Sequence, residues 1–234
     1  MKVSKSGYYK CKYRQKHPSQ KELARQRDIE LIKEIHEKHP SHGYRWINAF
    51  IRNKYGIIMS DNHVHLCCKY EGIRSKGKHY QWKKPGEQQY KFNNLIWNGW
   101  KYLSKPFEVI VSDMTAFWVK GTYYELTLYF DAWNKEIVGY GLSSRKGSIE
   151  SYNKLLDNYN IERSMSRAGT PTDNPVNESL NGWIKEELII DFDLKHCSAV
   201  PKLIEEYIYY YNNERPSYAL KYKTSIQYKI ESGF

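Results

Sequence analysis

Residues 107–143 read FEVIVSDMTAFWVKGTYYELTLYFDAWNKEIVGYGLS, and this stretch decides the fold class. It contains three runs rich in Val, Ile, Thr and aromatic residues, FEVIVSDMT, GTYYELTLYFDAW and KEIVGYGLS, which are typical of β-strands. The connections between the runs are short. We therefore expect three adjacent strands in an antiparallel meander.

The residues after the meander predict helices alternating with a further strand. We expect a short helix at 150–158, a strand at 161–166 (IERSMS) and a helix at 173–188 with Pro175 near its start. This order predicts a mixed α/β sheet with flanking helices.

The C-terminal segment, from Ser198 to the helix stop at Arg215-Pro216, carries apolar residues on one helical stripe. The stripe comprises Leu203, Ile204, Tyr207, Ile208 and Tyr211. Stripes at this spacing pack in a core far more often than they contact a ligand, so we expect these tyrosines in the core.

Three helices are expected before the meander. The first covers 20–38 and ends at His39-Pro40, the second covers 44–55 with Gly56 as its stop, and the third covers 62–71 after Ser60 or Asp61. Three short helices with positive ends are typical of a helix-turn-helix module, and a generic helical hairpin is the alternative.

The positive charge is confined to the first part of the chain. Residues 1–90 carry 20 Lys and Arg against 8 Asp and Glu, whereas residues 91–234 carry 17 against 18. A net charge of +12 on the first segment indicates a surface for the phosphate backbone of nucleic acid. A merely solubilising surface is the alternative.

A basic and aromatic linker is expected at 75–104, where Pro85-Gly86 interrupts the pattern. We expect it to lie along DNA and to contact it through a set of lysines. These are Lys76, Lys78, Lys83 and Lys84.

Several protein classes can be set aside. No run approaches the length of a membrane span and no signal peptide is evident, so we expect a cytosolic protein without membrane partners. Cys11, Cys67, Cys68 and Cys197 are expected to be reduced. Zinc binding by His63, His65, Cys67 and Cys68 is an alternative to core packing, but only His63 and Cys67 would share a helix face.

Two carboxylates stand where phosphoryl-transfer chemistry could use them. Asp113 follows the apolar run FEVIVS near an expected strand end, and Glu178 lies in the first turns of the helix at 173–188. Lys185 falls on the same helix face seven residues later. Carboxylates from separate elements can converge on Mg²⁺ ions, although each residue singly also suits a turn, a helix N-terminus or a solvated surface.

The chain resembles orfB-type bacterial insertion-sequence transposases, which have a retroviral-integrase-like core. The resemblance covers about residues 3–230 and rests on several stretches in the same order. They are VSKSGYYK (3–10), VSDMT (111–115), YYELTLYFDAWNKEIVGY (123–140), SMSRAGTPTDNPVNESLNGWIKEEL (164–188) and YIYYYNNERPSYALKY (207–222), and residues 22–74 are similar to the family's helix-turn-helix.

This resemblance implies an RNase H-like fold, two Mg²⁺ (or Mn²⁺) ions, and a DDE triad that cuts element ends and joins the 3′-hydroxyl to target DNA. Asp113 matches the first carboxylate and Glu178 the third, and both would be metal ligands. Lys185 matches a DNA-contacting residue, and Arg167 is a further expected DNA contact. Expected DNA contacts in the helical module and linker are Arg45, Arg52, Arg74 and the four lysines named above.

The middle carboxylate of the triad has no counterpart, because Leu142 stands at its position and no stretch like the family's HSDQGSQY exists in the chain. We infer an internal deletion with its junction in 143–151. Asp131 and Asp157 are the nearest acidic substitutes, but neither matches the required position. We expect a sheet one strand short, in which 161–166 pair with 107–112.

The expected organisation is a basic arm (1–19), a helix-turn-helix-like domain (20–74), a linker (75–104) and an internally truncated catalytic core (105–234). The function expected is that of a transposase subunit, a polynucleotidyl transferase by family, that no longer cuts DNA. The alternatives are a non-catalytic protein that competes with intact transposase at element ends, and a relic without a role. The resemblance also implies homo-oligomers on DNA, association with the nucleoid, and a separately encoded helix-turn-helix subunit, since the chain starts close to where catalytic frames of the family begin.

Overall fold

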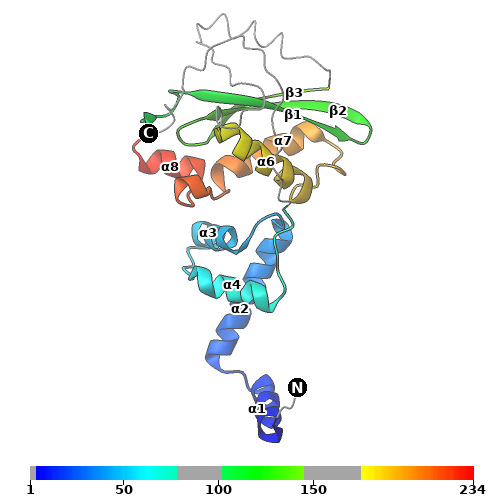
Figure 1. Cartoon of the computed structure of the whole chain (residues 1–234), viewed down its shortest axis with the longest axis vertical. Helices are drawn as coiled ribbons and strands as arrows, with labels where there is room; N and C mark the ends of the chain where they lie inside the picture. Colours follow the sequence, from blue (N-terminus) through cyan, green and yellow to red (C-terminus); the bar gives the residue numbers. More distant parts are fainter. Residues whose placement is uncertain (1–3, 78–101, 145–174) are drawn as a thin grey trace, which may run out of the picture.

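The computed structural model describes residues 4–77, 102–144 and 175–234, with the side chains of 175–181 excepted. Figure 1 shows a sheet with helices on one of its faces, a smaller group of helices beyond them, and a single helix at the N-terminal end. None of the helices in the described ranges has the length and apolar character needed to cross a membrane.

The smaller group consists of α2 (Gln20–Lys38), α3 (Tyr44–Tyr55) and α4 (Asp61–Tyr70). The hydroxyls of Ser19 and Ser60 cap α2 and α4, and Gly56 ends α3 in the left-handed region with φ 68°. The three expected helices are therefore confirmed. Their shared core is formed by Ile29, Ile32, Ile35, Ile47, Phe50, Ile51, Val64, Cys67 and Cys68.

Helix α1 (Lys5–Lys16) lies in the segment that the sequence predicts only as a basic arm. The Ser4 hydroxyl caps it by accepting a hydrogen bond from the Gly7 N–H (3.2 Å). None of its residues is buried, and Figure 1 shows it at the far end of the molecule from the sheet.

The sheet has the order β1-β2-β3 with both pairs antiparallel. The strands are β1 (Ile110–Val119), β2 (Thr122–Asp131) and β3 (Ile137–Ser143), so the expected meander is confirmed. The remaining elements are α6 (Pro175–Ile190), α7 (Val200–Asn213), a 3₁₀ turn (Tyr218–Leu220) and α8 (Ser225–Glu231), of which the last two were not expected. The mixed α/β class with a preceding helix-turn-helix-like domain is thus confirmed.

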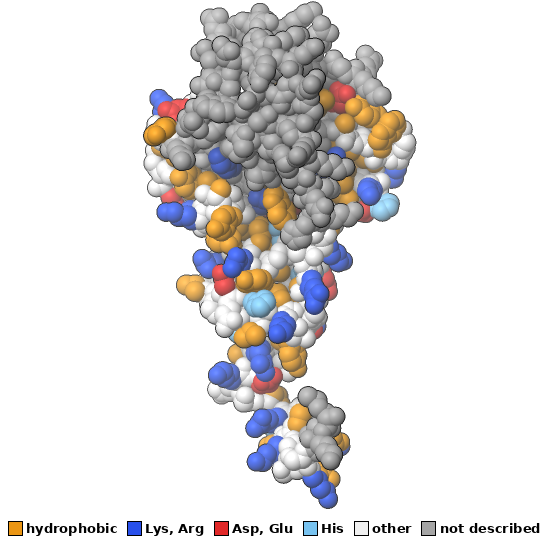
Figure 2. All heavy atoms as spheres, viewed as in Figure 1, with side chains coloured by type: hydrophobic (Ala, Val, Ile, Leu, Met, Phe, Trp, Pro, Cys, Tyr) orange, Lys and Arg blue, Asp and Glu red, His pale blue; other side chains and the backbone are white. Residues whose placement is uncertain are grey.

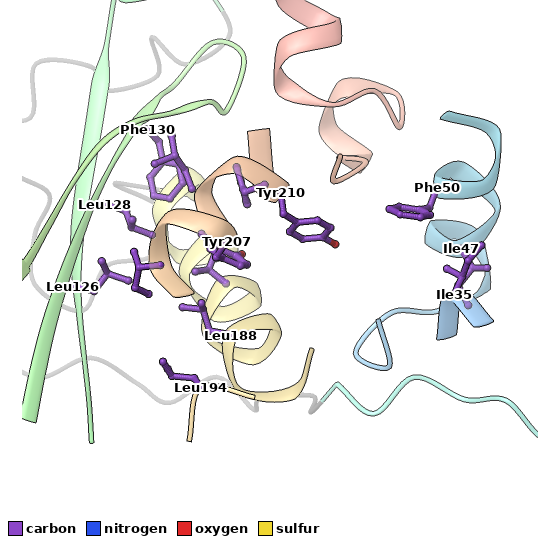
Figure 3. Close-up of a cluster of buried hydrophobic side chains, with 14 of the residues drawn as sticks. Ile35, Ile47, Phe50, Leu126, Leu128, Phe130, Leu188, Leu194, Tyr207 and Tyr210 are labelled. Atoms are coloured by element: carbon purple, nitrogen blue, oxygen red, sulfur yellow. The ribbon is translucent and has the colours of Figure 1, made fainter. Parts of the chain in front are cut away.

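One face of the sheet forms the larger core. Leu126, Leu128 and Phe130 of β2 are buried, and Figure 3 shows them next to Leu188 of α6 and Tyr207 of α7. Helix α6 packs against β1 and α7 against β3. The expectation that the tyrosines of the C-terminal stripe are core residues is confirmed, because Tyr207 and Tyr211 are buried. Tyr210, which is not on the expected stripe, is buried as well.

Strand β1 begins later and extends further than the sequence predicts. Phe107 has φ 65°, and its N–H donates to Asp131 Oδ2 (2.7 Å), so the chain turns before entering the strand at Ile110. The strand then pairs with β2 as far as Val119. The helix expected at 150–158, the strand expected at 161–166 and its pairing with 107–112 lie outside the described residues.

Candidate functional site

Asp113 is the fourth residue of β1, not a residue at the end of its strand as the sequence indicates. The expectation is wrong because backbone pairing with β2 continues beyond it, and Asp113 itself lies opposite Leu128. Directly paired residues in an antiparallel ladder lie on the same face of a sheet, so Asp113 is on the face of buried Leu128. That is the face on which α6 packs against β1. The Asp113 side chain is exposed, and its Oδ1 accepts a hydrogen bond from the Met114 N–H (2.9 Å).

Glu178 is the fourth residue of α6, and its side chain lies outside the described residues. Because α6 packs against β1, the helix bearing Glu178 and the strand bearing Asp113 are neighbours. Lys185, two turns later on α6, is exposed. Arg167 lies outside the described residues.

The position expected for the middle carboxylate is in β3. Leu142 lies opposite Leu126 there and packs partly buried against the core. Asp131 does not replace that carboxylate, because it is fully buried and accepts hydrogen bonds from the N–H groups of Phe107 (2.7 Å) and Trp133 (2.8 Å). Asp157 lies outside the described residues. Within the described part of the chain, no three His, Cys, Asp or Glu side chains come together as a metal site.

The expected DNA contacts of the helical domain are on its surface. Arg45, Arg52, Arg74 and Lys76 are all exposed. Figure 2 shows Lys and Arg side chains scattered over this part of the molecule and over α1. Lys78, Lys83 and Lys84 lie outside the described residues. A depression near the N-terminal end of α3 is lined by residues that include Tyr44, His65, Lys69 and Arg74.

Cys67 and Cys68 are core residues, as the sequence favours over a zinc site. Their exposed fractions are 2% and 4%, and burial raises the pKa of the Cys68 thiol to about 11, which disfavours the thiolate that a metal requires. His63 and Cys67 do meet, with Nε2 and Sγ 3.7 Å apart, but the same Nε2 lies 2.8 Å from Asp28 Oδ2.

A buried polar cluster that the sequence does not predict joins the two domains. We call Ser41, His42, Glu187, Asp191 and Arg215 the interdomain cluster. The Arg215 guanidinium binds Glu187 through Nε–Oε1 (2.8 Å) and a second nitrogen to Oε1 (2.6 Å). Ser41 donates to Asp191 from its N–H (2.9 Å) and its hydroxyl (2.7 Å). His42 Nε2 lies 3.4 Å from Glu187 Oε1 and 3.5 Å from Asp191 Oδ2.

Burial sets the protonation of this cluster. It lowers the pKa of His42 well below its ordinary value, and the charge of Arg215 lowers it further. It raises the pKa of Asp191 to about 6, against the hydrogen bonds from Ser41 that lower it. At neutral pH the His42 imidazole is therefore neutral, and the Asp191 carboxyl is mostly ionised.

Sequence reasoning could not find the cluster because its partners are far apart in the chain. Ser41 and Asp191 are separated by 150 positions, and Glu187 and Arg215 by 28. Locally, Arg215 beside Pro216 indicates a helix stop. A charged residue at the end of a buried tyrosine stripe needs a partner, but the local sequence does not indicate which residue that partner is.

Two family models match the chain. An HTH-like domain matches residues 23–80 and an integrase core domain matches residues 159–224. The chain is 28% identical to the transposase for insertion sequence element IS904 of Lactococcus lactis, over 88% of this chain and 95% of that protein. It is also 28% identical to the putative transposase InsK for insertion sequence element IS150 of Escherichia coli, over 55% of this chain and 56% of that protein.

Further similarity extends to a transposase-like protein and to one solved structure. The chain is 26% identical to an uncharacterized transposase-like protein of Haemophilus influenzae, over 75% of this chain and 95% of that protein. The structure is similar to a chain of the simian T-cell lymphotropic virus intasome in complex with a PP2A regulatory subunit, with a TM-score of 0.42 and a sequence identity of 14%. The comparison covers 85% of this chain and 74% of that chain.

Proposed function

We propose that this chain, a relative of insertion-sequence transposases with an HTH-like and an integrase core domain, binds the ends of its element and target DNA but does not cut them. The observation that carries the proposal is the order of the two domains in one chain. A domain of the HTH-like family precedes a domain of the integrase core family in the same chain, which supports recognition of DNA by this protein. The InsK match spans only about half of that relative, so the activity of the whole protein is itself part of the proposal.

The charge and exposure of the helical domain support DNA binding. Residues 1–90 carry a net +12, and Arg45, Arg52, Arg74 and Lys76 are all exposed. Each of these side chains can neutralise a phosphate and release counterions, so binding should weaken as salt rises. Lys185 on α6, and Arg167, Lys78, Lys83 and Lys84, would extend the contacts toward the core.

Two observations support loss of cutting. Leu142 packs against the core where a carboxylate would be needed. The alignment to the IS904 transposase runs over 243 positions, yet 88% of the 234 residues here is only about 206 residues. About 37 positions of that alignment therefore have no residue of this chain, which supports an internal deletion.

The carboxylate side chains that the structure describes do not make a two-metal site. The integrase core family is generally dependent on divalent metal ions. When bound, such ions would neutralise the charge that develops on phosphodiester oxygens. Asp113 and Glu178 could hold one Mg²⁺ or Mn²⁺ weakly from neighbouring elements, but a second ion needs a further ligand that the described residues do not supply.

The remaining features of the proposal concern organisation. We propose a basic arm at 1–19, a DNA-binding domain at 20–74, a linker at 75–104 and a truncated core at 105–234. The chain would act in the bacterial cytoplasm on the nucleoid, as a homo-oligomer and beside a separately encoded helix-turn-helix subunit. The leading alternative is a non-catalytic DNA-binding protein that acts by competing with intact transposase at element ends, and Leu142 at the position of the middle carboxylate suits it equally well.

The experiment that tests DNA recognition is a binding titration on duplexes carrying the ends of the element that encodes the chain. The control is a scrambled duplex of equal length. Replacing Lys76, Lys78, Lys83 and Lys84 by Gln should weaken binding to both duplexes and lower the salt slope by about 0.9 for each phosphate that a lysine no longer neutralises. Equal affinity for both duplexes by the wild-type chain would argue against end recognition, and an unchanged slope would mean that the lysines only solubilise.

A transposition assay in cells distinguishes a competitor of intact transposase from a relic without a role. Expressing the chain beside an intact transposase of the same element should lower the transposition frequency if the chain occupies the ends. An unchanged frequency, together with failure of the chain to accumulate, would favour the relic.

A further inference from the structure

Helix α6 connects the candidate carboxylate to the DNA-binding domain. Glu178 lies in its first turn, whereas Glu187 lies near its C-terminal end and Asp191 directly follows it. At about 1.5 Å per residue, Glu178 and Glu187 are about 13 Å apart along the helix axis. The first residues beyond α2 are in contact with this C-terminal end.

The segment of Pro40, Ser41 and His42 is fixed on both sides. On one side Ser41 donates two hydrogen bonds to the carboxylate of Asp191. On the other side the Ser75 hydroxyl donates to the Ser41 carbonyl, and the Lys76 N–H donates to the Pro40 carbonyl (2.8 Å). The connection between α2 and α3 is thereby held against α6 by bonds to its backbone as well as its side chains.

Aromatic rings close the interface around these bonds. The His42 ring stacks on Trp46 of α3 at 3.8 Å, and the His39 ring stacks on Tyr210 of α7 at 5.1 Å. Figure 3 shows Tyr210 directed from α7 toward Phe50 of α3. The polar cluster is therefore shielded from water, and its hydrogen bonds act in a medium of low dielectric constant.

The interface specifies one orientation of the domains. Glu187 and Ser41 are completely buried, and Asp191 accepts its two hydrogen bonds from Ser41 only while the domains are docked in this way. The ion pair between Glu187 and Arg215 lies within the core domain and faces His42 across the interface. A shift that separates Ser41 from Asp191 leaves a buried carboxylate without its donors, which is costly. Two further polar contacts join the described parts of the domains, from Asn53 to the Tyr222 carbonyl and from Lys54 to Glu214, and the second is exposed.

We propose that Ser41 and His42, seated on Asp191 and Glu187, are positioning residues that couple the DNA-binding domain to α6. DNA held by the first domain then has a fixed position relative to the α6 turn that carries Glu178. The significance of that turn for catalysis rests on the proposed function, but the coupling itself does not. Asp191 and Glu187 act through the helix and touch neither DNA nor a metal.

The test compares Asp191→Ala with Asp193→Ala. Asp193 is a matched control because it lies two residues away, is exposed, and pairs only at the surface with His196 (2.6 Å) in the described part of the chain. Spin labels go on cysteines introduced at exposed Lys69 and Lys202, one in each domain, with Cys11 and Cys197 replaced by Ser. The readout is the distance distribution between the labels in the full chain without DNA.

We expect one narrow distribution for the wild type and for Asp193→Ala. The distribution should be at least about twofold broader for Asp191→Ala, because domains without a specific interface move relative to each other. Asp191→Asn, which keeps an acceptor oxygen for Ser41, should give a distribution of intermediate width. If Asp191→Ala fails to fold, Ser41→Ala takes its place and should also give a distribution of intermediate width. An equally narrow distribution in all folded variants would overturn the coupling.

Binding to DNA separates this inference from the proposed function. If the coupling holds, Asp191→Ala should keep the affinity of the first domain for element ends but no longer protect the DNA next to the core in a footprint. If no variant binds element ends, the proposed function fails while the distance distributions still decide the coupling. A footprint of unchanged length in Asp191→Ala would contradict the proposal that α6 fixes the position of bound DNA relative to the core.

Discussion

At the scale of residues, the histidines of the domain interface make stability depend on pH. His39 is packed against Trp46, Phe50 and Tyr210, and burial lowers its pKa to about 4, with smaller effects of Glu187, Lys54, Glu214 and Lys38. Between pH 6.5 and 4 the unfolded chain binds a proton that the folded chain rejects. The free energy of unfolding therefore falls as pH falls through this window.

The variant His39→Phe should reduce this loss, because phenylalanine fills the same aromatic site and does not titrate. Asp191 acts in the opposite direction: its pKa is raised to about 6 from 3.8, so it adds stability on acidification and offsets part of the loss. Urea unfolding at pH 7 and pH 4.5 measures the difference, and His196→Ala at an exposed site is the control. An unchanged pH dependence in His39→Phe would show that another group controls it.

Glu187 and Arg215 form the second residue-scale prediction. Glu187 is completely buried and Arg215 is 8% exposed, so Arg215→Met leaves an unpaired carboxylate in the core. The expected cost is about 3–5 kcal/mol of unfolding free energy. The double variant Glu187→Gln with Arg215→Met should recover most of that stability, because it removes both charges and keeps an acceptor oxygen for the buried Tyr207 hydroxyl (2.9 Å). Additive losses in the two single variants and the double variant would mean that the pair does not interact as the distances indicate.

At the scale of elements, periodic runs with caps were predictable and isolated helices were not. Helices α2, α3 and α4 were expected because apolar residues recur at helical spacing between recognisable stops. Helix α1 has no apolar stripe and no buried residue, so its sequence carries no such signal. The start of β1 was missed because a left-handed residue, Phe107, turns the chain within an apolar run.

Helix α1 should serve DNA binding and not stability. An isolated helix of 12 residues is marginal in water, and this one carries Lys5, Lys10, Lys12, Arg14 and Lys16 without an acidic residue. Removing residues 1–17 should leave the melting temperature unchanged within about 1 °C. It should also reduce affinity for duplex DNA at low salt and lower the salt slope. A large fall in melting temperature would show that α1 packs on the body of the protein.

At the scale of the whole molecule, the sequence predicted the class of fold and the domain order, but not how the domains are joined. Asp113 and Lys185 could be singled out from their surroundings in the chain, whereas the interdomain cluster depends on contacts across 150 positions. The helices and strands can be predicted from the local pattern of residues. The docking of the domains depends on buried polar groups that meet only in the folded state. The proposed loss of the middle carboxylate is a prediction of the local kind, because it rests on Leu142 at one position of a motif.

The most direct test of the account is an incubation of the full chain with Mg²⁺ or Mn²⁺ and duplex DNA that carries the ends of its own element. The proposed loss of one triad ligand would remove negative charge needed to hold both metal ions, so we predict bound DNA with both strands intact. Nicks at the 3′ ends of the element that disappear in Asp113→Ala would contradict it.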